Sequence, residues 1–405
     1  MTLSRVGRIS RALVVSMAVV LGMSACGGYT VGFMWVLGTQ FNQITGFKID
    51  DFTGNLTQMV NSPYPSGGTN PVSITVRVGG NFVFVVNKGT VDSKGKSNHD
   101  GNVSVFAVGQ DGILTFQNAY FTPASTPVWA SVDGTGSYLY VLDAQSPAYN
   151  GVTDFTGDIT VYAIDGSTGR LQLVPNQLIK NAQGTQLTYF PVGPAPTMLR
   201  VGGSCVYTLD SGDQSIYSYG VGSSGQLTVE PNSTFKIGAT NLTSIGVSGS
   251  SIYLTDAGTN QILPFSAGTS CSLSPSVGGA VTNLPLTANP VWTMTDSKNK
   301  FLYVLNHGTT SSQNANSTIS AYVIQTTGAL VPISDPQNPY PVGNGPVCMA
   351  EDPSNQYIYT SNANDGSVTG KFINQNTGQL SNLSRGSTFP ATGQATCLAI
   401  SGNVD

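Results

Sequence analysis

One strand pattern recurs seven times along the 405-residue chain, and this repeat constrains the fold more than any other feature. Each copy is a short run of aromatic and β-branched residues, and every copy after the first ends in Asn or Asp. The copies occupy residues 33–37, 82–87, 138–143, 205–210, 252–256, 301–306 and 357–362. Such residues favour β-strands, and a regular repeat of this length is typical of propellers and other repeat architectures.

A tight turn is the second recurring signature. A sequence close to Thr-Gly-x-Leu occurs at residues 53–56, 111–114, 168–171, 224–227, 327–330 and 377–380, and a degenerate copy reads Ser-Cys-Ser-Leu at 270–273. Gly is expected there because a tight hairpin needs a residue with positive φ, and the Leu that follows returns to the core. A further strand precedes most copies of the first pattern. It often opens with Pro, as at Pro127, Pro196, Pro290 and Pro346, where Pro costs no ladder hydrogen bond.

The two ends of the repeat region predict a closed ring. The first repeat lacks its first strand, and residues 394–400 form an extra first-strand copy after the last complete repeat. Pairing between these ends removes two exposed edges, which is how propellers protect their sheets. We therefore predict an all-β fold over residues 29–405: a seven-bladed β-propeller of four-stranded blades, closed by the C-terminal strand. The rival, a two-sheet sandwich, has no need of seven copies.

The N-terminal segment is expected to be an export signal over residues 1–25. Three Arg residues precede a short apolar run that is too short to span a bilayer. Residues 23–26 then read Met-Ser-Ala-Cys, which resembles a bacterial lipobox and implies acylation of Cys26, with residues 26–28 as the lipid-anchored N-terminus. The alternative is an ordinary secretory signal cut near Ala25. We expect an exported protein on the bacterial cell envelope, held at the membrane by its lipid only, at the outer membrane or cell surface.

Charge excludes one class of partner. Only 9% of the residues are charged, and removal of residues 1–25 leaves 13 basic against 20 acidic residues. A mildly acidic chain without a basic patch argues against nucleic acid. There is no P-loop, Rossmann fingerprint or metal-binding Cys or His spacing, so we expect no cofactor and no metal. We expect a monomer whose partner is a small lactone, a glycan or an envelope protein.

Four cysteines remain after Cys26, an even number that permits two disulfides in an exported chain. Cys348 and Cys397 lie on the first strands of two blades that closure makes neighbours. Cys205 begins a second strand, and Cys271 lies in the turn of the next blade on the same face. The repeat therefore predicts the pairs Cys205–Cys271 and Cys348–Cys397.

Candidate functional residues gather on the face that carries the loops between second and third strands. Three of these loops are long, and long loops often carry function. His307 and His99 are candidate general bases, because histidine titrates near neutral pH. Candidate ligand-binding residues are Asn87, Lys88, Asp100, Asp143 and Asn306. The repeated Asn or Asp that ends a second strand has a second interpretation, which is to bond backbone amides and terminate the strand.

Arg77 and Arg200 also admit two readings. Each is followed by Val-Gly-Gly, and we place them at matching positions near the ends of two first strands. An acidic substrate is one possible partner for such an Arg. A position near the hairpin face favours a structural role.

The strand and turn unit resembles the lactonase family of seven-bladed propellers, which includes bacterial 6-phosphogluconolactonase, and it is similar to YVTN-repeat propellers. The resemblance covers about residues 29–405 and implies a hydrolase that opens a cyclic ester. Sugar-lactonase members carry His-Pro at blade starts, whereas this chain has Asn70-Pro71, Thr126-Pro127 and Ala195-Pro196 at such positions. Two hypotheses follow: a lactonase acting at the funnel mouth, or a non-catalytic propeller that binds a protein or glycan.

Overall fold

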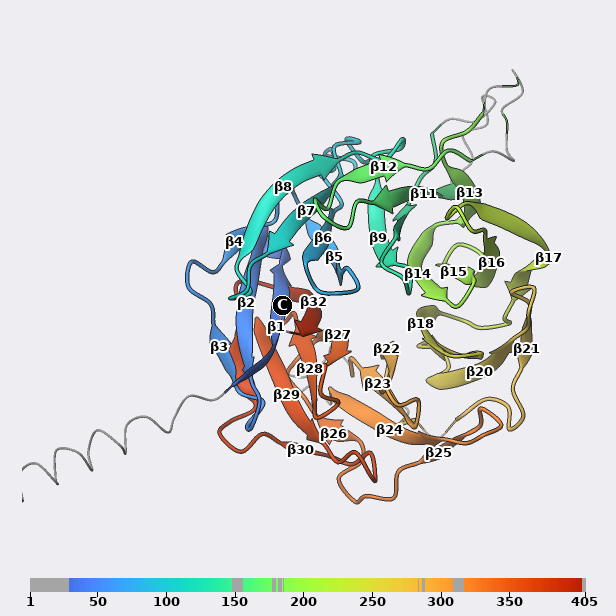
Figure 1. Ribbon diagram of the computed structural model, residues 1–405. Coiled ribbons are helices and arrows are strands. Elements are labelled where there is room, and N and C mark those ends of the chain that lie inside the picture. The colour runs from blue at the N-terminus through green and yellow to red at the C-terminus, as the bar shows by residue number, and fades with distance from the viewer. Residues whose placement is uncertain are drawn as a thin grey trace, which may run out of the picture.

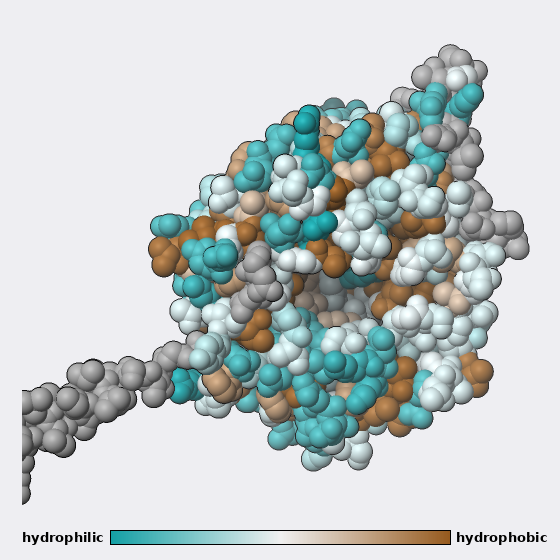
Figure 2. Space-filling view, in the orientation of Figure 1, coloured by the Kyte–Doolittle hydropathy of each residue, from teal (hydrophilic) through white to brown (hydrophobic). Residues whose placement is uncertain are grey.

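The strands of the chain form seven antiparallel sheets arranged in a ring (Figure 1). The computed structural model describes residues 29–147, 156–176, 180, 184, 186–282, 284–285, 288–308 and 317–402. Figure 2 shows that the centre of the ring is hollowed on the face in view. The predicted seven-bladed β-propeller is therefore confirmed. The expected signal segment and Cys26 lie outside the described residues, among which no helix is long and apolar enough to cross a bilayer.

Each blade has an inner, a second, a third and an outer strand, and in four blades the outer strand is divided in two. The inner strands are β32 (Ala395–Gly402), β5 (Pro71–Val76), β9 (Pro127–Val132), β14 (Pro196–Gly202), β18 (Leu242–Ser248), β22 (Pro290–Thr295) and β27 (Pro346–Glu351). The second strands are β1 (Thr30–Gly38), β6 (Phe82–Asn87), β10 (Tyr138–Asp143), β15 (Cys205–Asp210), β19 (Ser251–Asp256), β23 (Phe301–Asn306) and β28 (Tyr357–Asn362).

The third strands, for blades 1 to 7 in chain order, are β2 (Gln43–Asp50), β7 (Asn102–Val108), β11 (Thr156–Ile164), β16 (Ser215–Val221), β20 (Gln261–Ala267), β24 (Thr318–Ile324) and β29 (Ser367–Ile373). The outer strands are β3 (Leu56–Gln58) with β4 (Tyr64–Pro65), β8 (Leu114–Tyr120), β12 (Leu171–Leu173) with β13 (Phe190–Pro194), β17 (Leu227–Lys236), β21 (Leu273–Pro275), β25 (Leu330–Pro332) with β26 (Tyr340–Pro341), and β30 (Leu380–Asn382) with β31 (Thr388–Pro390). One short 3₁₀ helix, η1 (Thr39–Phe41), joins β1 to β2.

The first and last strands close the ring as predicted. Strand β32 pairs antiparallel with β1, so that the C-terminal strand becomes the inner strand of blade 1 (Figure 1). Every inner strand contacts the inner strands of its two neighbouring blades, including β27 with β32 and β32 with β5. Closure leaves the second strands fully sheltered, and all six residues of β6 and of β23 are buried.

Glycines in the predicted turns pack against the preceding blade. Gly378 in blade 7 has φ of 72°, and a Cβ there would lie 2.5 Å from Cδ1 of Phe301, the first residue of the second strand in blade 6. The same contact joins Gly169 to Phe82. It recurs between Gly54 and Tyr357, Gly112 and Phe33, and Gly225 and Tyr138. The turn glycine is thus needed both for its positive φ and for the aromatic ring that covers it.

Hydrogen bonds reinforce this contact between blades. The residue two positions after each of three covering rings donates to the carbonyl oxygen of the same turn glycine: Tyr359 to Gly54 at 2.6 Å, Tyr303 to Gly378 at 3.0 Å, and the Trp35 indole to Gly112 at 3.1 Å. A buried hydroxyl or indole needs such a partner. The bond from Tyr359 joins the last blade to the first.

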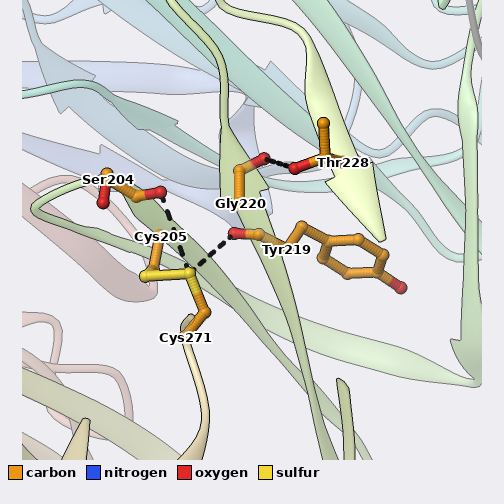
Figure 3. Close-up of a disulfide and its surroundings, with 6 residues drawn as sticks. All are labelled: Ser204, Cys205, Tyr219, Gly220, Thr228 and Cys271. Atoms are coloured by element: carbon orange, nitrogen blue, oxygen red, sulfur yellow. Dashed lines mark hydrogen bonds between the residues drawn. A yellow bond between two sulfur atoms is a disulfide. The ribbon is translucent and has the colours of Figure 1, made fainter. Parts of the chain in front are cut away.

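Both predicted disulfides are confirmed. Cys205–Cys271 has a Cα–Cα distance of 5.6 Å and Cys348–Cys397 one of 5.0 Å. Cys271 replaces the turn glycine of blade 5 and keeps its positive φ of 56°. Cys205 stands where other blades place an aromatic residue, so the disulfide substitutes for the glycine–aromatic contact. In Figure 3 the sulfur of Cys271 faces the carbonyl oxygen of Tyr219, 3.5 Å away. Disulfides suggest an extracellular or periplasmic protein.

Candidate functional site at the channel mouth

One ring of residues borders the mouth of the central channel. The residue after each of six second strands donates its N–H to a carbonyl oxygen just before or at the opening of the same blade's inner strand. Lys88 bonds Asn70 O at 2.9 Å and His307 bonds Asn289 O at 3.0 Å. The other members of this mouth ring are Ala144, Ser211, Ala257 and Ala363. The repeat therefore fixes Lys88 and His307 at equivalent positions in blades 2 and 6.

Each blade is also bulged beside the mouth. The pairing between inner and second strands shifts register by one residue, for example between Pro71 and Ser73 in blade 2 and between Pro290 and Trp292 in blade 6. Such bulges bend a strand and re-aim its side chains, and they are common next to active sites. The residue left without a partner in the ladder is Val72 in blade 2 and Val291 in blade 6.

A cavity of about 470 Å³ opens at the mouth between blades 2, 3 and 4. Its walls combine apolar and polar groups: Val72, Lys88, Val128, Ala144, Gln145, Ala195, Pro196, Thr197 and Ser211. This volume lies within the usual range for small-molecule sites, roughly 300–1,000 Å³. Lys88 supplies the positive charge, and no described carboxylate pairs with it. The sequence pointed to Lys88 but missed Gln145, Thr197 and Ser211, whose only signal is adjacency to a second-strand end or to the opening of an inner strand.

A larger cavity of about 590 Å³ lies in blade 3, between the ends of β11 and β12. It includes Asp165 and Arg170. Asp165 is bonded within its own turn, because it accepts from Ser167 N at 2.9 Å and from Ser167 Oγ at 2.6 Å. This cavity lies away from the mouth ring, at the turn between the third and outer strands of blade 3.

His307 is half-buried at the mouth but does not line the cavity. Its carbonyl oxygen accepts a hydrogen bond from Ser317 Oγ at 2.9 Å, which fixes the backbone. Its Nδ1 atom is buried without a hydrogen-bond partner among the described residues. Since blades 2 and 6 are three steps apart around the ring, His307 and Lys88 stand on different sides of the opening.

Asn87 and Asn306 are fully buried behind the mouth ring. The Asn87 amide donates to Asn102 Oδ1 at 3.0 Å and to Ser66 O at 3.2 Å. The Asn306 amide donates to Ser320 Oγ at 2.9 Å. Neither side chain reaches the cavity. These bonds tie a strand end to its neighbours, but they run to side-chain oxygens and one carbonyl and not to the backbone amides that the second interpretation expects.

Asp143 forms a buried acidic pair with Asp158, its direct partner in the β10–β11 register. Both side chains are fully buried. Asp143 Oδ1 accepts from Thr122 Oγ1 at 2.6 Å and from Thr126 N at 2.8 Å. The Oδ2 atom of each carboxyl is buried without a hydrogen-bond partner among the described residues. Burial raises the pKa of Asp143, and burial together with the neighbouring Asp143 charge raises the pKa of Asp158, so the pair retains a proton.

His99 and Asp100 do not act on one another. The His99 ring is hydrogen-bonded through Nδ1 to Ala124 O at 2.7 Å. Asp100 accepts from Thr90 N and Thr90 Oγ1, both at 2.7 Å, and these bonds lower its pKa. The two residues close a long loop of blade 2, and Asp100 stays ionised. Neither lines the mouth cavity.

The placement of Arg77 and Arg200 at matching positions is wrong. Arg77 follows β5 and is held at the hairpin face, where Nε donates to Gly136 O at 2.9 Å. Arg200 pairs with Tyr207 in the middle of blade 4 and lies inside the ring. Two residues separate the paired Gly202 and Cys205 in the hairpin of blade 4, whereas six separate the paired Val76 and Val83 in blade 2. Equal spacing to Val-Gly-Gly therefore places the two arginines at different depths.

Metal-binding groups do not converge in the part of the chain that the structure describes. No three His, Cys, Asp or Glu side chains there come together as a metal site requires. The chemistry available at the mouth is therefore that of one ammonium group, neutral hydrogen-bonding side chains and apolar walls.

Part of the chain matches a known family. Residues 29–188 match the family model described as "Lactonase, 7-bladed beta-propeller". That segment contains the cavity residues of blades 2 and 3. No functionally curated protein matches the chain.

Solved structures share the fold over nearly their whole length. A putative 6-phosphogluconolactonase from Bacteroides fragilis is 18% identical, with a TM-score of 0.67 over 93% of this chain and 99% of its own. The periplasmic gluconolactonase of Pseudomonas aeruginosa is 15% identical, with a TM-score of 0.68 over 92% and 99%. A Lactobacillus plantarum protein is 17% identical, with a TM-score of 0.68 over 92% and 100%. At such identities the likeness establishes a common fold.

Proposed function

We propose that this protein binds a small lactone in the mouth cavity and hydrolyses it to the open hydroxy acid. The cavity itself carries the proposal: it has the volume of a small-molecule site, and its walls combine apolar groups, neutral hydrogen-bonding groups and one ammonium that no described carboxylate pairs with. The match of residues 29–188 to a lactonase family model supports the choice of substrate.

The proposed chemistry gives a role to four side chains. Water adds to the lactone carbonyl, the ring C–O bond breaks, and the alkoxide takes up a proton, which gives a hydroxy acid. The Lys88 ammonium stabilises the negative charge that develops on the carbonyl oxygen. His307 lies outside the cavity on another side of the opening, so it accepts the proton of the attacking water only for a substrate that extends across the mouth from Lys88. Thr197 and Gln145 hold the hydroxyl groups of the ring.

One observation favours a second candidate function, non-catalytic binding. The described lining of the cavity contains no His, Asp or Glu side chain, so a base must act from outside it. A propeller that only holds a glycan or lactone needs no such base. Both functions require that the ligand binds in the cavity, but only the lactonase converts it to a product.

Kinetics with matched variants separate the two functions. The purified protein is assayed against sugar lactones and acyl-homoserine lactones, together with Lys88→Met and the control Lys236→Met on the exposed outer strand β17. We expect kcat/KM to fall by about 10²-fold or more for Lys88→Met, the usual cost of one oxyanion donor, and to stay unchanged for Lys236→Met.

The histidines are compared in the same way. His307→Ala is expected to lower kcat, whereas His99→Ala leaves it unchanged. Turnover unchanged by His307→Ala refutes the base assignment. Binding of a lactone without turnover of any of them refutes hydrolysis and establishes the second function.

We also propose that the protein is exported and anchored through Cys26. The two disulfides support an extracellular or periplasmic location. Fractionation of cells that express Cys26→Ser tests the anchor: release of the protein from the membrane fraction is expected, and retention contradicts it.

A further inference from the structure

Three side chains from different blades meet inside the ring, below the mouth. The guanidinium carbon of Arg200 on β14 lies 4.9 Å from the ring centroid of Trp129 on β9 and 4.7 Å from that of Trp292 on β22. The two indole centroids are 5.6 Å apart, with the rings inclined at 43°. The three groups thus form a triangle in which the cation packs on both rings. Figure 1 shows β9, β14, β18 and β22 in succession around the centre of the ring.

This cluster has an excess of hydrogen-bond donors. Arg200 Nε donates to Ile245 O at 3.2 Å. A guanidinium has five N–H groups, and the others find no acceptor among the described residues. No described carboxylate forms an ion pair with Arg200. The indole N–H of Trp129, in the same cluster, is buried and also lacks an acceptor.

A cation in such a place calls for an anion. Burial lowers the pKa of Arg200 to about 10, so the group stays charged at neutral pH. Arg200 is half-buried, and a cation that is partly removed from water without a counter-charge favours an anionic partner. The described groups next to the Arg200 guanidinium are two indole rings and one backbone carbonyl, and no carboxylate. The missing acceptor is therefore supplied from outside the described chain.

Residues of the cluster lie on the same strands as residues of the mouth cavity. Thr197 lines the cavity and precedes Arg200 by three residues on the same strand, which corresponds to about 10 Å at roughly 3.3 Å per residue. Val128, another wall residue, directly precedes Trp129. Arg200 and Trp129 are only half-buried although they lie deep in the ring, so part of their surface remains accessible from its interior.

We propose that Arg200, Trp129 and Trp292 form a binding site for a small carboxylate that enters through the mouth. The free edge of the guanidinium offers a planar pair of N–H groups that matches a carboxylate. The two indoles border the site with flat apolar faces, which suits a planar anion better than a tetrahedral one. The Trp129 N–H provides a further donor. This site does not depend on lactone hydrolysis.

Tryptophan fluorescence provides the test, because two of the three Trp residues belong to the cluster. The purified protein is titrated with acetate and gluconate, and in separate arms with inorganic phosphate and chloride at matched ionic strength. A saturable change with the carboxylates is expected. Arg200→Met is expected to weaken carboxylate binding at least about tenfold, whereas Arg77→Met, the same change at the hairpin face, leaves it unaltered.

Arg200→Lys keeps the charge and the fold-supporting packing but loses the fork, and it too is expected to bind carboxylate more weakly. Circular dichroism and a thermal melt verify that each variant is folded. The proposal is overturned if no carboxylate gives a saturable signal, if phosphate or chloride binds more tightly than the carboxylates, or if folded Arg200→Lys binds as well as the natural protein.

Discussion

Gly378→Ala tests how the blades are joined. The residue has φ of 72°, which costs an alanine about 1–2 kcal/mol. The added Cβ would also lie 2.5 Å from Phe301 Cδ1 and 2.6 Å from Ile333 Cδ1, closer than carbon atoms approach in proteins. Relief of such overpacking costs typically about 1–3 kcal/mol. We therefore expect a loss of about 2–5 kcal/mol in the free energy of unfolding.

Equilibrium unfolding in urea measures this loss, and two further variants divide it into its parts. Gly95→Ala is the control, because Gly95 has a similar φ of 78° and an added Cβ there meets nothing within 4 Å. It should cost only the backbone strain of about 1–2 kcal/mol. In a Phe301→Ala background, the loss caused by Gly378→Ala should shrink because the contact with Phe301 is gone, although the contact with Ile333 remains, which gives a coupling energy of at most about 1–3 kcal/mol. Equal losses for Gly378→Ala and Gly95→Ala refute the packing argument.

Two more predictions concern the acidic pair and the closing strand. The pKa values of Asp143 and Asp158 are raised in the folded protein. Above the ordinary carboxyl pKa of 3.8, the folded protein therefore keeps protons that the unfolded chain releases. The free energy of unfolding consequently falls as the pH rises from there toward neutrality. Asp158→Asn should reduce this dependence of stability on pH, which is at most about 1.4 kcal/mol per pH unit for one proton. Urea unfolding between acid and neutral pH measures it. An unchanged slope contradicts the assignment. Truncation after Gly393 removes β32 and its disulfide partner Cys397, and should leave blade 1 open to proteolysis at β1. A truncated chain as protease-resistant as the natural one contradicts closure by β32.

The regular parts of the molecule could be predicted because they are encoded in spacing. Seven strand copies and an unpaired first-strand copy at the C-terminus are enough to require closure. Both disulfides could be predicted once the four cysteines, Cys205 with Cys271 and Cys348 with Cys397, were placed by their positions within the repeat. Each of these inferences needs only the order of elements, which a repeat fixes without knowledge of any side-chain direction.

The site could be predicted only in part, because it depends on depth within the ring. Arg77 and Arg200 share the same local sequence, yet different hairpin lengths place one at the rim and the other inside. Lys88 was identified because it follows a strand end in a long loop. Trp129 and Trp292 carry no signal of their own, since aromatic residues on an inner strand are equally suited to packing between blades.

A crystal structure of the protein with a sugar lactam tests the central claim most directly. A lactam keeps the ring and carbonyl of a lactone but resists hydrolysis, so it should remain in the site intact. The account predicts that the ring lies in the mouth cavity against Val72 and Val128, with its carbonyl oxygen within hydrogen-bonding distance of the Lys88 ammonium. A lactam bound at another face of the propeller, or an empty mouth cavity at saturating lactam, contradicts it.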